Sequence, residues 1–277
     1  MKIAVIVSCY NRKLMSQRCL TQLQKQALEY PEHSFTFYVY DDASTDGTPE
    51  MIREKFPCVI LMCGQGGLYW CKSMHQAMKE AVKEDYDLYL MINDDVDFYD
   101  DALKTMFHAY DIADKPCAIV GATKETMADN ISYGGRDQER KLLTPNQELQ
   151  QCSWANWNCF LVDREIIRNV GLIDDKYQHS WGDFDYSHRM KEKNYPIYLA
   201  MKCVGKCDTN SIEGTFKDMK IGKRKQLQKL FLPKGMPFYS YMRYHMRVYG
   251  RKGWFKYLYG YMSVIAYIIL GKPLDTK

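Results

Sequence analysis

The stretch FYVYDDASTDGT, residues 37–48, joins a strand-like run to a pair of carboxylates and a turn. Residues 37–40 are apolar and aromatic, which is typical of a buried strand, and Asp41 and Asp42 stand where this strand leaves the sheet. The Asp-Gly dipeptide that follows favours a turn, and the Thr-Pro dipeptide after it is typical of a first helical turn. The stretch therefore predicts a strand, a turn and a helix, with two acids at the carboxyl end of the strand.

The same alternation of strand and helix extends through the first 120 residues. Helices are expected over about 13–28, from 48, over 68–83 and over 101–112, between the runs KIAVIVS, FTFYVY, CVILM, YDLYLMI and CAIVG. Strands separated by helices of this length predict an α/β fold with a mostly parallel central sheet flanked by helices. Ligands of such sheets bind at the carboxyl ends of the strands, where VSCYN, YDDAST and INDDVD lie.

Acidic side chains are concentrated in YLMINDDVDFYDDAL, residues 89–103. Asp100 or Asp101 is expected to cap the next helix, but Asp94, Asp95 and Asp97 need another explanation. Like charges at one strand end repel each other and raise each other's pKa unless a cation offsets them. We favour Mg²⁺ or Mn²⁺, which takes one or two protein carboxylates together with phosphate oxygens and water, over a purely structural role.

The pair Asp41-Asp42 has two interpretations that the sequence leaves open. A carboxylate at the sheet edge can accept a hydrogen bond from a ring N–H, such as the imide of uracil or thymine, and a local Asx-turn explains the pair about as well. A calcium-binding EF-hand loop starting at Asp42 is excluded, because its twelfth position is Arg53 where a bidentate Glu is required.

A third acidic cluster lies in WGDFDYSHR, residues 181–189. A helix starting near Gly182 places Asp183 in its first turn, where acids are common because they complement the helix dipole. If the other two clusters hold a diphosphate, a second reactant such as a hydroxyl must react with the group that it carries. The carboxylate of Asp183 is suited to act as the general base for this hydroxyl.

Four motifs, VIVSCYNR (5–12), VYDDASTDGT (39–48), LMINDDVDF (90–98) and WGDFDYSHR (181–189), together resemble the family 2 glycosyltransferases with the GT-A fold, of the bacterial rhamnosyltransferase-like kind. The resemblance covers roughly residues 1–215. It implies an inverting transfer from a UDP- or dTDP-sugar to a hydroxyl of a saccharide or lipid-linked saccharide, in cell-surface polysaccharide biosynthesis. It also implies that Asp183 is the catalytic base, that Asp95 contacts Mn²⁺ or Mg²⁺, and that the nucleotide sugar is bound by Ser8, Tyr10, Asp42, Asp94 and Gly67.

Two positions depart from the family pattern. Gly182 stands where many relatives have Glu, and Lys206 and Cys207 stand near the place of a metal-binding His. These departures keep open a nucleotide-sugar-binding protein with impaired catalysis. A nucleotidyltransferase is the other alternative, although SCYNRKLMS lacks the glycines of a triphosphate loop. Trp154 and Trp157 are equally compatible with stacking on acceptor sugars and with a core position.

The charge distribution divides the chain into a predicted catalytic domain, residues 1–216, and a basic, aromatic, helical extension, residues 217–277. The extension contains fourteen Lys and Arg against two acids, whereas the preceding residues are acidic overall. Basic residues interleaved with aromatics favour an element on an anionic membrane surface over a packing or dimer element, and nucleic acid is not expected as a partner. The run 254–270 is too polar to span a membrane. Scattered cysteines and no recognisable signal sequence predict a cytoplasmic protein, peripheral at the inner face of the cytoplasmic membrane.

Overall fold

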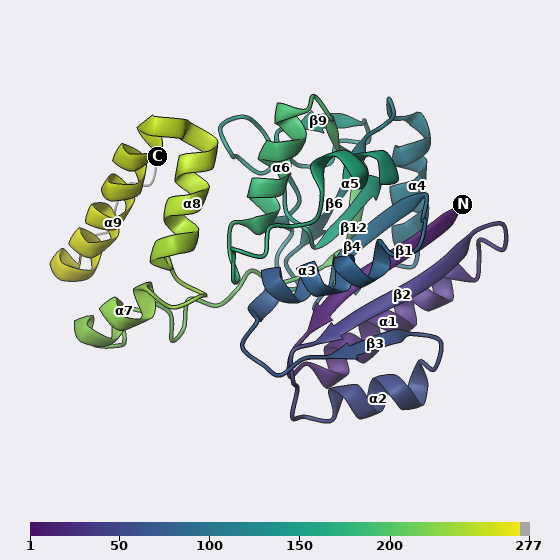
Figure 1. Cartoon of the computed structure of the whole chain (residues 1–277), viewed down its shortest axis with the longest axis horizontal. Coiled ribbons are helices and arrows are strands. Elements are labelled where there is room, and N and C mark those ends of the chain that lie inside the picture. Colours follow the sequence, from purple (N-terminus) through teal and green to yellow (C-terminus); the bar gives the residue numbers. More distant parts are fainter. Residues whose placement is uncertain (272–277) are drawn as a thin grey trace.

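Four parallel strands form the first half of the central sheet in the computed structural model, which describes residues 1–271 (Figure 1). Their order in the sheet is β3-β2-β1-β4, with bounds β1 (Lys2–Cys9), β2 (Ser34–Asp41), β3 (Ile60–Cys63) and β4 (Leu88–Asn93). The helices that connect and follow them are α1 (Lys13–Ala27), α2 (Thr48–Lys55), α3 (Tyr69–Ala81) and α4 (Ala102–Ile112). The predicted alternation of strand and helix is confirmed.

The second half of the sheet contains antiparallel strands. β11 (Cys159–Asp163) lies antiparallel between β4 and β6 (Ala118–Lys124), and β12 (Ile197–Lys206) runs parallel to β6. Short strands complete this half: β5 (Asp97–Phe98), β7 (Ile131–Tyr133), β9 (Gln150–Cys152) and a separate pair of β8 (Gly135–Arg136) with β10 (Trp154–Ala155). The segment between β6 and β9 therefore forms short antiparallel pairings, β6 with β7 and β8 with β10, connected by turns and irregular chain.

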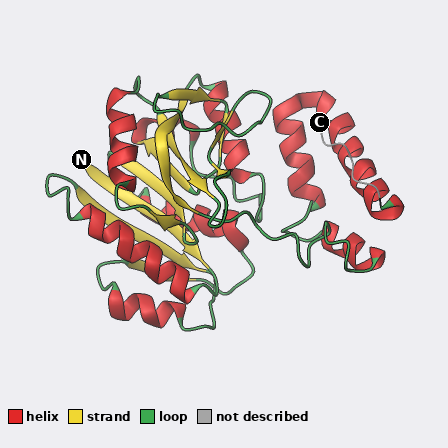
Figure 2. Ribbon diagram, turned by 180° about the vertical axis from the view of Figure 1, so that it is seen from behind, coloured by secondary structure: helices red, strands yellow, loops and turns green. Residues whose placement is uncertain are grey.

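Helices cover both faces of the sheet (Figures 1 and 2). Alternate residues of β1 point to opposite faces: Ile3, Val5 and Val7 pack with the buried side chains of α1 and α4, and Ala4 and Ile6 pack with those of α3 and α6 (Gly182–Glu192). Burial of both faces explains why β1 and β4 are almost continuously apolar. α5 (Arg164–Val170) joins β11 to the segment before α6.

The start of α4 corrects one prediction. Neither Asp100 nor Asp101 caps this helix, and the backbone N–H of Leu103 instead donates to Oε1 of Gln26 on α1 at 2.9 Å. Asp100 faces solvent with a side chain that is 91% exposed. The buried amide of Gln26 is available because α1 packs directly against α4, a contact that the local sequence does not encode.

The C-terminal helices are α7 (Lys223–Leu230), α8 (Phe238–Tyr249) and α9 (Gly253–Leu270), with a 3₁₀ turn, Gly250–Lys252, before α9. They lie beside the layered domain, and α8 is the one that contacts α6 (Figures 1 and 2). They share a hydrophobic cluster of their own that includes Leu230, Tyr241 and Tyr257. Within residues 1–271, no helix has the length and apolarity to cross a membrane. The last six residues of the predicted extension, 272–277, lie outside the described part.

Candidate active site

The predicted nucleotide residues follow the carboxyl ends of three adjacent strands. In the parallel register, Ser8 of β1 lies beside Tyr40 of β2 on one side and Asn93 of β4 on the other, so the ends of these strands meet at one edge. Ser8 is buried, whereas Tyr10 is 57% exposed just beyond the end of β1. An exposed aromatic ring at this edge is free to stack on a planar ligand.

Asp41 and Asp42 are both buried and hydrogen-bonded, and the local-turn interpretation applies to Asp41. Oδ1 of Asp41 accepts from the backbone N–H of Ser44 at 2.8 Å, which is the local turn. Oδ2 of Asp42 accepts from the backbone N–H groups of Leu68 and Tyr69 at 2.9 and 3.0 Å. Asp42 therefore satisfies two of the otherwise free N–H groups at the start of α3, and its remaining lone pairs are the ones available to a ligand.

Arg12 bridges Asp94 and Asp95. Its Nη1 donates to Oδ1 of Asp94 at 2.9 Å and to Oδ2 of Asp95 at 2.8 Å, and Oγ of Ser16 donates to the other oxygen of Asp94 at 2.8 Å. Burial raises the pKa of Asp94 to about 6 even though Arg12 acts to lower it. The like charges at this strand end are thus offset by a guanidinium from the chain itself, which the sequence analysis did not consider.

The surroundings of Asp95 decide how a divalent ion fits. Its side chain is 23% exposed, and the one hydrogen bond found for its Oδ1 within residues 1–271 comes from the thiol of Cys207, with Sγ at 3.6 Å. The inner carboxylate, Asp94, is fully engaged by Arg12 and Ser16. Residues 1–271 contain no cluster of three His, Cys, Asp or Glu side chains arranged to hold a metal. The residues present fit an ion that takes one oxygen from Asp95 and its other ligands from phosphate and water.

Asp183 lies in the first turn of α6 and is partly buried. Its Oδ2 accepts from Nδ2 of Asn156 at 3.1 Å, and its Oδ1 accepts from the backbone N–H of Phe184 at 2.9 Å. Burial raises the pKa of Asp183, and the positive charge of Arg136 acts in the opposite direction. A carboxylate with a raised proton affinity and a fixed orientation is suited to accept a proton.

Gly182 is explained by packing. A Cβ at this position would overlap Sγ of Cys71 and lie 3.0 Å from Cδ1 of Ile173. A side chain here would therefore begin in the contact between α3 and the segment before α6, which only a glycine leaves undisturbed.

The first turn of α3 contacts all three acidic motifs. Leu68 and Tyr69 bind Asp42, and Nε1 of Trp70 donates to Oδ1 of Asn93, the residue before Asp94, at 2.8 Å. Cys71 packs against Gly182, the residue before Asp183. Three segments that are separated in sequence therefore converge on four consecutive residues. Gly66 and Gly67 precede this turn with φ of 88° and 82°, a conformation that glycine adopts without strain.

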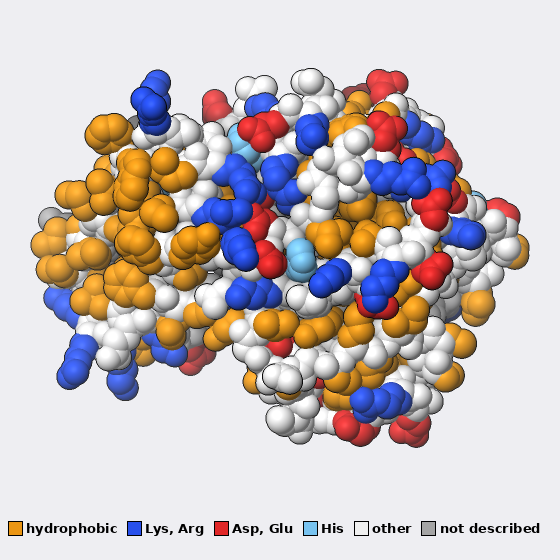
Figure 3. Space-filling view, in the orientation of Figure 1, with side chains coloured by type: hydrophobic (Ala, Val, Ile, Leu, Met, Phe, Trp, Pro, Cys, Tyr) orange, Lys and Arg blue, Asp and Glu red, His pale blue; other side chains and the backbone are white. Residues whose placement is uncertain are grey.

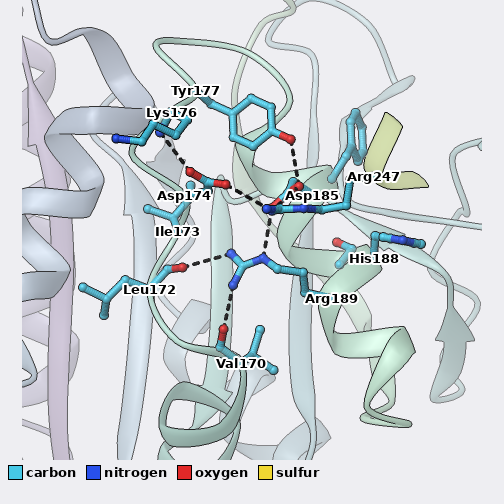
Figure 4. A network of polar contacts seen from close by, with 12 residues as sticks. Val170, Leu172, Ile173, Asp174, Lys176, Tyr177, Asp185, His188, Arg189 and Arg247 are labelled. Carbon is cyan, nitrogen blue, oxygen red and sulfur yellow. Dashed lines mark hydrogen bonds and ion pairs between the residues drawn. The ribbon is translucent and has the colours of Figure 1, made fainter. Parts of the chain in front are cut away.

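A buried network of ion pairs and hydrogen bonds connects α6 to the C-terminal helix α8 (Figure 4). Asp185 is fully buried, and accepts from the Tyr177 hydroxyl at 2.8 Å, from Nε of Arg189 at 2.9 Å and from Nη1 of Arg247 at 2.7 Å. Arg247 belongs to α8 and also lies 3.1 Å from Asp174. The C-terminal helices are thereby joined by ion pairs to the helix that carries Asp183.

Both tryptophans left open by the sequence are buried. Trp157 is 1% exposed and packs in the core against Phe160 and Tyr186, so it does not stack on a sugar. Trp154 is 7% exposed, and its ring is covered by Arg140 with the guanidinium carbon 4.5 Å from the ring centroid.

The sequence analysis missed the residues that hydrogen-bond or pair with the predicted site residues and their helices. They are single residues scattered along the chain and form no motif: Arg12, Trp70, Arg136, Arg140, Asn156 and Arg247.

A family model described as "Glycosyl transferase family 2" matches residues 4–171. The chain belongs to this family. The matched range contains the strand ends that bear Ser8, Asp42 and Asp94, and it stops before Asp183. The expected family and enzyme class are confirmed, whereas the finer rhamnosyltransferase-like likeness stays a prediction. No curated protein sequence matches the chain significantly.

Several solved structures share the fold. S. aureus TarS 1–349 in complex with UDP-GlcNAc is 13% identical with a TM-score of 0.59, covering 98% of this chain and 93% of that 1–349 chain. The mannosyltransferase PcManGT from Pyrobaculum calidifontis, in complex with GDP-Man and Mn²⁺, is 17% identical with a TM-score of 0.55, covering 98% and 76%. GalNAc-T7 with UDP, GalNAc and Mn²⁺ is 13% identical with a TM-score of 0.58, covering 99% and 59%. The predicted GT-A fold is confirmed.

Proposed function

We propose that this family 2 glycosyltransferase inverts the anomeric carbon as it moves a sugar from a UDP- or dTDP-sugar to a hydroxyl of a saccharide or lipid-linked saccharide. The observation that carries the proposal is the convergence of the three acidic motifs on the first turn of α3. The nucleotide sugars in the TarS and PcManGT complexes support the class of donor.

The donor residues have distinct tasks in this proposal. The exposed ring of Tyr10 stacks on the base, and the free lone pairs of Asp42 accept from the base or ribose. Ser8 and Gly67 allow close approach of the nucleotide at the edge of the sheet. Asp94 holds Arg12 in place, so that its charge stays beside the position of the diphosphate.

Asp95 would hold Mn²⁺ or Mg²⁺ by one oxygen. When bound, such an ion neutralises the negative charge that develops on the leaving diphosphate. Arg12 contributes positive charge at the same place, since its Nη1 lies 2.8 Å from Asp95. The Mn²⁺ in the PcManGT and GalNAc-T7 complexes supports the choice of ion.

Asp183 takes the proton of the acceptor hydroxyl as its oxygen attacks the anomeric carbon from the face opposite the diphosphate. The Asn156 amide fixes the carboxylate, and the backbone N–H of Phe184 orients its second oxygen. Gly182 has a packing reason of its own, because a Cβ at this position would overlap Sγ of Cys71. The glycine is therefore not by itself a sign of lost catalysis.

A thermal-shift screen with UDP-, dTDP- and GDP-sugars, each with and without Mn²⁺, tests the proposal. We expect the largest rise in Tm for a UDP- or dTDP-sugar with Mn²⁺, and slow hydrolysis of that donor which Asp183→Asn lowers. Donor binding without hydrolysis or transfer would support the impaired-catalysis alternative. Binding of a nucleoside triphosphate with release of pyrophosphate would support the nucleotidyltransferase.

We further propose that the protein is cytoplasmic and that α9 lies on an anionic membrane surface, where a lipid-linked acceptor of a surface polysaccharide would be reached. Hydrophobic side chains gather over the C-terminal helices in Figure 3. The exposed ones on α9 are Trp254, Phe255, Leu258, Tyr259, Met262, Ile269 and Leu270, and basic residues flank them at Arg251, Lys252 and Lys256. Aromatic side chains with adjacent cations are typical of interfacial helices.

Sedimentation with phosphatidylglycerol-containing and pure phosphatidylcholine vesicles tests the membrane surface. We expect binding to the anionic vesicles only, reduced by Phe255→Ser but not by Met127→Ser, which changes a residue that is 95% exposed on the catalytic domain. A dimer in analytical ultracentrifugation, with no binding to either vesicle, would instead identify α9 as an interface between copies.

A further inference from the structure

Two arginines of the segment from β8 to β9, Arg136 near Asp183 and Arg140 over Trp154, form no ion pair within residues 1–271. Arg136 pairs with Trp154 across the β8–β10 ladder, and the chain continues from Trp154 to Asn156, whose amide holds Asp183. The Arg136 guanidinium carbon lies 5.9 Å from the ring centroid of Phe184, the residue after Asp183. Within residues 1–271, no carboxylate forms an ion pair with Arg136 or Arg140.

The guanidinium of Arg136 presents one edge that the described chain leaves unused. Nη1 donates to the backbone oxygen of Arg140 at 2.8 Å. Nε is buried and has no acceptor within residues 1–271, and no hydrogen bond of Nη2 is found there either. The Nε–Nη2 edge is the fork that binds a carboxylate or phosphate through two parallel hydrogen bonds. Burial lowers the pKa of Arg136, and the nearby charge of Asp183 offsets only part of this effect.

Arg140 is held by the C-terminal helix α8, and its charge acts on Arg136. Its Nη2 donates to the hydroxyls of Tyr244 and Tyr249 of α8 at 2.6 and 3.0 Å, and its guanidinium lies over the ring of Trp154. The acids of the same hairpin are used elsewhere: Asp137 accepts from the backbone N–H of Lys141, and Glu139 pairs with the Lys141 ammonium. The hairpin therefore supplies two positive charges to the site and no free negative one.

We propose that Arg136, supported by Arg140, binds an oxyanion of the acceptor, so that the acceptor saccharide carries a phosphate or carboxylate close to the hydroxyl that Asp183 deprotonates. This inference rests on the proposed transfer reaction and names the class of its acceptor. The anion contacts Nη2 of Arg136, the unpaired nitrogen of this edge that is not buried, and a rotation of the Arg136 side chain toward the acceptor brings Nε into the same contact. Arg140 adds charge from the side of Trp154. A neutral acceptor leaves the Arg136 edge without a partner.

A direct binding experiment reads the Nε–H signal of Arg136 by ¹⁵N NMR, assigned by its loss in Arg136→Lys. The wild-type protein is titrated with methyl phosphate, with sodium acetate and with sodium chloride at matched ionic strength. We expect a saturable shift with methyl phosphate, with acetate or with both, and the stronger of the two identifies the kind of oxyanion. No saturable shift, or the same shift with chloride, would overturn the proposal.

An acceptor panel tests the consequence for transfer. It pairs neutral octyl glycosides with their 6-phosphate and uronate counterparts and compares kcat/KM. We expect the anionic members to be preferred, and Arg136→Gln to lower the ratio of anionic to neutral kcat/KM by about 10- to 100-fold. Lys141→Gln makes the same charge change on the same hairpin, on a side chain that is 74% exposed, and should keep the ratio.

The results that would overturn the anionic acceptor differ from those that would overturn the proposed transfer reaction. A wild-type preference for neutral acceptors, or equal ratios in Arg136→Gln and Lys141→Gln, overturns the anionic acceptor while transfer itself stands. Absence of UDP or dTDP binding by calorimetry overturns the proposed transfer reaction, and the Arg136 signal then still decides whether this edge binds an oxyanion.

Discussion

Replacement of Arg247 by Met tests whether α8 is part of the folding unit that carries Asp183. The change removes the Nη1 hydrogen bonds to both oxygens of Asp185, at 2.7 and 2.8 Å, and the ion pair to Asp174. Asp185 keeps its contacts with Arg189 and Tyr177, so it is not left fully unpaired.

The expected magnitude follows from this partial loss. Removing one partner of a buried charge pair costs about 3–5 kcal/mol when nothing else remains, and a hydrogen bond to a charged group contributes about 1.5–3 kcal/mol. Because Asp185 retains two donors and the Arg247 side chain is 27% exposed, we expect the free energy of unfolding to fall by about 2–3 kcal/mol.

Urea denaturation followed by circular dichroism measures this change, with Arg168→Met as the matched control. Arg168 pairs with Asp85 at 2.7 Å, a similar distance, but both side chains are 63% exposed, so its loss should cost less than about 1 kcal/mol. The double mutant Arg247→Met with Asp185→Asn should show a coupling energy of about 2 kcal/mol. Equal costs for Arg247→Met and Arg168→Met, or additive effects in the double mutant, would refute the reasoning.

Three further predictions concern the site. Gly182→Ala should lower the free energy of unfolding by about 1–3 kcal/mol in urea denaturation, because its Cβ overlaps Cys71, and Cys71→Ala should restore part of the loss. Asp183→Asn should lower transfer by about 10²–10⁴-fold, and the wild-type kcat/KM should fall with decreasing pH at a value above the usual aspartate range, because the base must be ionised and burial raises its pKa. In metal-free buffer, the wild type should lose about 2 kcal/mol of stability relative to Asp94→Asn as pH rises from 4 to 7, because the folded state binds the Asp94 proton up to a pKa of about 6 while the unfolded chain releases it near 3.8.

Each of these has an outcome that contradicts it. Unchanged stability of Gly182→Ala would mean that α3 and α6 are less closely packed at Cys71. Full transfer by Asp183→Asn would assign the base elsewhere. A stability difference between wild type and Asp94→Asn that does not vary with pH would show that Arg12 keeps Asp94 ionised throughout.

The local sequence determined the elements and the chemistry of the strand ends. Almost continuously apolar runs between helical segments predicted the order of strands and helices through residue 120, because strands that are buried on both faces of a sheet need apolar side chains on both. The motifs around Asp42, Asp94 and Asp183 were sufficient to identify the family, which the match over residues 4–171 confirms. The assignments of individual site residues stay predictions that the experiments above test.

Tertiary structure decided the partners of those residues. Arg12 bridges Asp94 and Asp95 across more than eighty residues of chain, Gln26 replaces the expected aspartate cap of α4, and Asp42 binds the start of α3. A hydrogen bond between distant segments depends on which side chains the packed elements bring within about 3 Å, and a pattern of neighbours along the chain carries no information on that distance. The first turn of α3, where the three motifs meet, is therefore visible only in the folded molecule.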